Sequence, residues 1–177
     1  MIWIYLGQIA FPLGLIFWLV FLPAKNTLGF WMQVLATVLA LFAVLLSGLW
    51  LFPPWWMPYL FALLLFAAII FAWRRNEAKS FLPQNLLSWA FAVLFMSLGI
   101  YSAHAATQSI AATSPPSEEI VDLAFPFAKG QFLIANGGND LRINSHQESM
   151  ISTDPRFKPW RGNGHGVDII AINAWGL

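Results

Sequence analysis

Apolar residues form four long runs along the first 110 residues, and none of these runs shows a polar face. A hydrocarbon core about 30 Å thick needs roughly 20 apolar helical residues to cross it. Each run approaches or exceeds this length, and a soluble helix bundle would show a polar face on each helix. We therefore expect four transmembrane helices, at about residues 2–22, 28–52, 56–73 and 86–106.

Polar or helix-breaking residues separate the apolar runs. Pro23 and Lys25 follow the first run, Pro53 and Pro54 follow the second, and the basic stretch at residues 74–79 follows the third. Proline ends a helix because it lacks the backbone N–H that the next turn needs. Tryptophans gather near the ends of the runs, as is typical of membrane–water interfaces; they are Trp3, Trp50, Trp55, Trp56, Trp73 and Trp89.

The pattern changes after the fourth run. Residues 107–121 are rich in Ser, Thr, Pro and Ala, and their composition predicts a linker. Short alternating or apolar stretches follow and predict strands; they lie at residues 131–135, 140–144 and 167–172, with a loop at 147–164. The expected fold is four transmembrane α-helices followed by a small antiparallel β segment, with a helical section at 1–106, a linker at 107–123 and a partial β domain at 124–177.

The charges divide the chain in the same place. Residues 1–110 carry five of the 17 charged side chains, whereas residues 111–177 carry the other twelve. The net charge of +1 implies no particular polyanionic partner, and no basic run suggests nucleic acid, so we expect none as a partner. The chain has no cysteine, so disulfides and thiolate metal sites are excluded as well.

The distribution of positive charge predicts how the helices are oriented. Lys25 lies between the first and second runs, and Arg74, Arg75 and Lys79 lie between the third and fourth. In a four-helix meander both connections face the same side, which the positive-inside rule places in the cytoplasm. We therefore expect an integral protein of a bacterial inner or plasma membrane, in contact with membrane lipid, with its N-terminus and its C-terminal section outside the cytoplasm. Small residues at 103–105 leave open a signal-peptidase cut after the fourth helix.

Two histidines and one aspartate are the candidates for chemistry in the C-terminal section. Asp168 opens the last predicted strand, His165 precedes it by three residues, and His146 follows the second predicted strand. Imidazole and carboxylate groups that converge can hold zinc, with an open position left for water. The spacing alone leaves two interpretations open: a zinc site, or a turn in which Asp168 accepts hydrogen bonds.

Three stretches of this section, FPFAKGQFLIANGGND, INSH and GHGVDIIAIN, resemble the opening of a lysostaphin-type zinc metallopeptidase domain. The resemblance covers about residues 124–177 and leaves the helical section outside. It implies an antiparallel β fold and hydrolysis of peptide cross-links in bacterial cell walls. In that family a histidine and an aspartate in a Gly-Val-Asp strand bind the metal, and a later His-x-His motif supplies the remaining ligand and a catalytic histidine.

The resemblance assigns Asp168 as a zinc ligand, because GVDI at residues 166–169 matches the aspartate strand. The histidine ligand has two candidates. The commonest spacing falls on Gly164, one residue before His165, whereas members with a longer loop carry the ligand in a motif like INSH, which favours His146 over His165. The metal-site residues that we expect are therefore His146 and Asp168, with His165 as the alternative.

No His-x-His motif follows Asp168 in this chain. We therefore expect a membrane-anchored, metallopeptidase-like protein that is truncated and inactive by itself, with zinc as its cofactor and a peptidoglycan peptide as a possible partner. The alternative is a non-enzymatic membrane protein whose extracytoplasmic tail binds a partner or the cell wall. The sequence assigns no catalytic residue and no oligomeric state.

Overall fold

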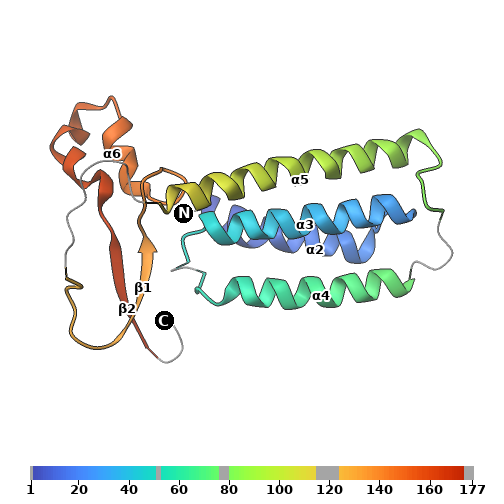
Figure 1. The fold of residues 1–177 in the computed structure, drawn as a ribbon, viewed down its shortest axis with the longest axis horizontal. Helices are drawn as coiled ribbons and strands as arrows, with labels where there is room; N and C mark the ends of the chain where they lie inside the picture. Colours follow the sequence, from blue (N-terminus) through green and yellow to red (C-terminus); the bar gives the residue numbers. More distant parts are fainter. Residues whose placement is uncertain (1, 51–52, 76–79, 115–123, 174–177) are drawn as a thin grey trace. The chain divides into compact units, whose positions relative to one another are not determined.

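The computed structural model describes residues 2–50, 53–75, 80–114 and 124–173, which form two compact units (Figure 1). We call Met1–Leu46 together with Trp56–Thr107 the helical unit. Ser47–Trp55 together with Gln108–Leu177 form the C-terminal unit.

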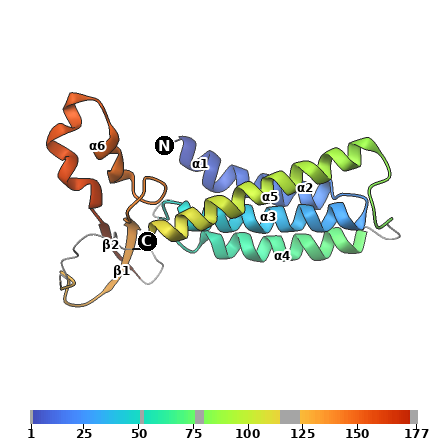
Figure 2. The ribbon, with the colours of Figure 1, turned by 45° about the horizontal axis from the view of Figure 1, so that its top comes forward.

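Four helices in the described residues are long and apolar enough to cross a membrane, and they indicate a membrane protein. Figures 1 and 2 show them side by side. The first spans 20 residues and consists of α1 (Ile2–Tyr5), a π-helical turn (Leu6–Ala10) and α2 (Phe11–Phe21). The others are α3 (Thr27–Ser47), α4 (Met57–Arg75) and α5 (Leu86–Ala112), with 21, 19 and 27 residues.

The π-helical turn in the first helix has a local cause. Pro12 lies at the start of α2 and has no N–H to donate to the carbonyl of Gln8. The preceding turn widens, and the N–H of Phe11 bonds to the carbonyl of Leu6, five residues back. The helix thus passes the proline without ending.

Asparagine side chains begin two of the spanning helices. The Asn26 side-chain oxygen accepts a hydrogen bond from the N–H of Gly29 at 2.7 Å, and that of Asn85 accepts one from the N–H of Ser88 at 2.8 Å. Each cap satisfies one of the backbone donors that a helix leaves free in its first turn. The starts of α3 and α5 are therefore fixed by local sequence.

Aromatic and small side chains fill the interior of the helical unit. Leu19 and Phe30 are fully buried, and Trp18 packs on Phe91 and Phe95 with ring centroids 6.0 and 5.2 Å apart. Many large apolar side chains instead point away from the bundle, including Leu35, Leu63, Phe66 and Ile100. Apolar surface of this extent is typical of helices that contact lipid.

The helix positions were predicted well and their ends less well. α3 ends at Ser47 rather than near residue 52, because Gly48 follows it directly. α5 continues to Ala112, through residues that were expected to begin a linker. Residues 107–112 contain no proline or glycine, so nothing in the chain stops the helix there.

The C-terminal unit contains an antiparallel ribbon of two strands, β1 (Gln131–Asn136) and β2 (Asp168–Ile172). The register pairs Gln131 with Ile172 and Ile134 with Ile169, and a bulge then places Asn136 opposite Asp168. Between the strands lie a 3-10 turn (Ser145–Gln147), α6 (Glu148–Ile151) and a 3-10 helix (Pro155–His165), which gather at one end of the ribbon in Figures 1 and 2.

Two predictions for this unit were wrong. Residues 140–144 form a turn instead of a second strand, because the Asp140 carboxylate accepts the N–H of Arg142 at 2.9 Å and the Asp140 carbonyl accepts that of Asn144 at 2.9 Å. Residues 147–164, expected to be a loop, contain short helices. Asp154 caps the longest of these and Pro155 starts it, since proline suits the first position of a helix.

Candidate metal centre

The fold brings His146 and Asp168 into direct contact. The Nε2 atom of His146 lies 3.1 Å from Oδ1 of Asp168, although 22 residues separate them along the chain. Both side chains reach solvent, with 34% and 50% of their surface exposed. His146 comes from the 3-10 turn after residue 144, and Asp168 is the first residue of β2.

His165, the alternative ligand, lies at the end of the long 3-10 helix. Its Nδ1 atom is 3.5 Å from the side-chain nitrogen of Gln147. Within the part of the chain that the structure describes, no group of three or more His, Cys, Asp or Glu side chains converges on one point. The structure therefore pairs Asp168 with the histidine that the longer-loop arrangement favours.

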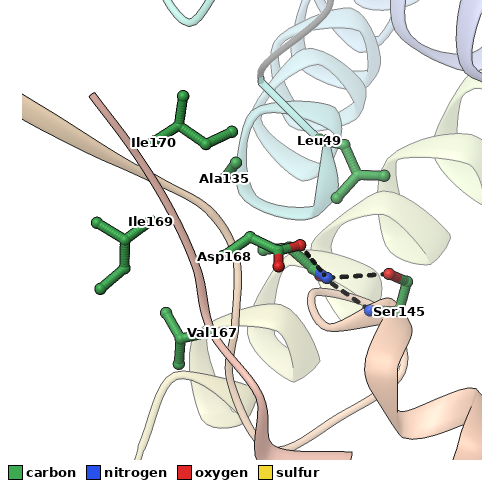
Figure 3. Close-up of a pocket in the computed structure, with 8 residues that line it drawn as sticks. Leu49, Ala135, Ser145, Val167, Asp168, Ile169 and Ile170 are labelled. Carbon is green, nitrogen blue, oxygen red and sulfur yellow. Dashed lines mark hydrogen bonds between the residues drawn. The ribbon is translucent and has the colours of Figure 1, made fainter. Parts of the chain in front are cut away.

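The carboxylate of Asp168 is held from its other side by Asn136. Nδ2 of Asn136 donates to Oδ2 of Asp168 at 3.1 Å and to Oγ of Ser145 at 3.0 Å, while its Oδ1 accepts the N–H of Ser145 at 2.9 Å (Figure 3). Asn136 is buried, and the bulge in the ribbon places it opposite Asp168. Bulges often re-aim a side chain in this way. Both carboxylate oxygens of Asp168 thus have a fixed partner.

Asn144 positions the turn that carries His146. This amide is completely buried, and its Oδ1 accepts the N–H of His146 at 3.1 Å. Its Nδ2 lies 2.8 Å from the carbonyl oxygen of Gly138 and 3.2 Å from those of Gly164 and Gly166. One side chain therefore connects three separate segments around the histidine.

Glycine allows the histidine ring to come close to the chain before β2. A Cβ atom built on Gly166 would lie 3.3 Å from Cδ2 of His146 and 2.9 Å from the carbonyl oxygen of Asn163. The second contact is shorter than real Cβ atoms show, so a larger residue would push this segment away from the imidazole. Gly166, in the GHGVDIIAIN stretch, is therefore needed for this packing.

A hollow of about 500 Å³ lies beside the aspartate (Figure 3). Asn136, Ser145 and Asp168 form its polar wall. The rest of its lining is apolar and consists of Leu49, Ala135, Val167, Ile169 and Ile170. A carboxylate with an ordered partner at the edge of an apolar hollow is a common form of ligand site.

The separation of the two polar atoms suits a metal ion. Zinc binds imidazole nitrogen and carboxylate oxygen at about 2.0–2.2 Å, so two ligand atoms on a tetrahedral zinc lie about 3.3 Å apart. The 3.1 Å between Nε2 of His146 and Oδ1 of Asp168 differs little from this value.

The residues that support the pair were not singled out from the sequence. Asn136 and Asn144 occur within the stretches that carry the resemblance, but asparagine beside glycine or serine usually indicates a turn. Their roles depend on contacts across 32 and 22 residues, which no local pattern reveals.

Comparisons with protein families, curated proteins and solved structures found no match to this chain. The geometry of the site therefore carries the functional argument by itself. The similarity to lysostaphin-type domains stays a prediction from the residues quoted above.

Proposed function

We propose that the C-terminal unit binds zinc through Nε2 of His146 and Oδ1 of Asp168, as part of a membrane-tethered, metallopeptidase-like protein related to cell-wall peptide hydrolysis. The contact between these two atoms carries the proposal. The resemblance assigned Asp168 and favoured His146, with His165 as the alternative. A metal site is the function that explains why a histidine and an aspartate so far apart in sequence are held together by two buried asparagines.

The surrounding residues have the roles that a zinc site needs. Asn136 donates a hydrogen bond to Oδ2 of Asp168, the carboxylate oxygen that does not contact His146. Ligating carboxylates in known metal sites are held by hydrogen bonds in the same way. Asn144 sets the position of His146 through its backbone. Zinc held there would polarise a peptide carbonyl and activate a water molecule for attack.

A catalytic zinc site takes three protein ligands, and the described residues supply two that are in contact. The proposal therefore predicts metal binding by this chain and assigns peptide hydrolysis to it only together with a third ligand.

Zinc titration of the purified full chain tests the proposal, with a chromophoric chelator as competitor. We expect one zinc per chain, and at least a tenfold loss of affinity in His146→Ala and in Asp168→Ala. His165→Ala is the matched control and should bind like the parent. With cobalt in place of zinc, the parent and His165→Ala should show the absorption bands of tetrahedral coordination. His146→Ala and Asp168→Ala should not. Absence of zinc binding by the folded parent would overturn the proposal.

A second candidate function has its own observation. Phe125, Phe127 and Phe132 form a cluster with ring centroids 4.8 to 5.6 Å apart, and the first two are about half exposed. Such a surface favours a tail that binds a partner without a metal. In that case the contact between His146 and Asp168 is an ordinary hydrogen bond, and the zinc titration would show no binding.

A further inference from the structure

The charged side chains of the helical section lie in or directly beside two of the segments that connect its helices. Residues 1–112 contain four cations, Lys25, Arg74, Arg75 and Lys79, and the single acid Glu77. Lys25 follows α2, and Arg74 and Arg75 form the last turn of α4. The connection at 48–56 carries no charged side chain. Among the residues of this section that the structure describes, the charged side chains are Lys25, Arg74 and Arg75, and all three are cationic.

Hydrogen bonds hold the two charged connections together. The N–H groups of Thr27 and Leu28 donate to the carbonyls of Ser80 and Phe81, each at 3.0 Å. The Nη1 atom of Arg75 lies 3.4 Å from the carbonyl oxygen of Val20 in α2. Lys25, Arg74 and Arg75 thus lie at the same end of the bundle, and their side chains are exposed.

An aromatic pair lies next to the cations. Trp31 is one turn from the start of α3 and Trp73 is two residues before Arg75, with ring centroids 5.6 Å apart. Trp31 and Trp73 are 49% and 48% exposed, so each residue is partly buried and partly accessible at the surface of the bundle. Indoles prefer the level of the lipid headgroups, so this pair marks where the headgroups lie.

We propose that this cationic end of the helical unit binds the headgroups of anionic phospholipids. Guanidinium groups pair with phosphate through two parallel hydrogen bonds, and a lysine adds a point charge. Trp31 and Trp73 place the Arg74, Arg75 and Lys25 side chains at the depth where those phosphates lie. The surface discriminates by charge, so it prefers phosphatidylglycerol to phosphatidylcholine.

Native mass spectrometry of the full chain in detergent tests this proposal, with equal amounts of phosphatidylglycerol and phosphatidylcholine as the probe. The parent should retain more phosphatidylglycerol. In the triple variant Lys25→Gln, Arg74→Gln, Arg75→Gln, the ratio of bound phosphatidylglycerol to phosphatidylcholine should fall at least about fivefold, because each cation near an anionic surface contributes about that factor. A triple control, Lys129→Gln, Lys158→Gln, Arg161→Gln, removes the same charge from the C-terminal unit and should keep the parent ratio.

Two further measurements decide the matter if the triple variant does not fold. Arg74→Lys with Arg75→Lys retains the charge and should retain the preference. In the parent, raising the salt from about 0.1 M to about 1 M shortens the screening length from about 10 Å to about 3 Å and should lower the preference. A parent without preference, a preference that salt leaves unchanged, or an equal loss in the control variant would each overturn the proposal.

Discussion

At the scale of single residues, two buried amides position the side chains of the candidate metal centre. His146 and Asp168 are partly exposed, whereas Asn136 and Asn144 are buried. A buried amide must find partners for both its oxygen and its nitrogen, so it constrains every segment that supplies them. The geometry of the pair is thus set by neutral side chains behind it.

Replacing Asn144 tests this interpretation. Asn144→Ala leaves the N–H of His146 and the carbonyls of three glycines without their partner, and unpaired buried groups cost about 1–3 kcal/mol. We expect a loss of about that size in the stability of the C-terminal unit, measured by hydrogen exchange of residues 131–172. The control Asn163→Ala removes an exposed amide and should leave exchange unchanged. Similar exchange in both variants would mean that Asn144 does not hold the unit together.

At the scale of elements, the sequence was most informative where one physical force dominates. The four spanning helices follow from uninterrupted apolar runs, because lipid leaves a backbone no alternative to the helix. Strands β1 and β2 follow from short apolar stretches bounded by glycine. Residues 140–144 were predicted as a strand because polar and apolar residues alternate there. They form a turn because Asp140 accepts hydrogen bonds from the N–H groups of residues that closely follow it, and the alternation gives no sign of this local effect. The contact between His146 and Asp168 depends on tertiary packing, so residue spacing could identify the two residues as candidates but could not predict that they touch.

The cap of the long 3-10 helix should respond to acid. Arg156 donates hydrogen bonds to Asp154 from its guanidinium and its backbone N–H, and these lower the pKa of the Asp154 carboxyl below its usual value of 3.8. A carboxyl whose pKa is lower in the folded state stabilises that state above its unfolded pKa, and the contribution disappears as the pH falls through the folded pKa.

Amide exchange in residues 155–165, corrected for intrinsic rates, should therefore accelerate as the pH falls below about 4. The effect should be less than roughly tenfold, since exposed ion pairs stabilise little. Asp154→Asn keeps a capping oxygen but cannot titrate, so its corrected exchange should not show this acid step. A step of equal size in parent and variant would assign it to another group.

At the scale of the whole molecule, the two proposals concern different units and can fail independently. Zinc binding depends on residues of the C-terminal unit, and lipid preference depends on cations of the helical unit. The orientation predicted from the loops connects the two, since anionic headgroups would meet Lys25, Arg74 and Arg75 on the cytoplasmic side and the candidate metal centre would face the cell wall.

Single cysteines test this orientation cleanly, because the chain has none of its own. Ser80 lies between α4 and α5, and Ser114 follows α5, so one membrane crossing separates the two positions. The positive-inside rule places Ser80 in the cytoplasm and Ser114 outside. In right-side-out vesicles, a membrane-impermeant maleimide should label Ser114→Cys directly and Ser80→Cys only after detergent is added. Each variant is a matched Ser-to-Cys exchange and serves as the control for the other. The opposite pattern would mean that the candidate metal centre lies in the cytoplasm, where there is no cell-wall peptide. The proposed substrate would then be wrong even if the chain binds zinc.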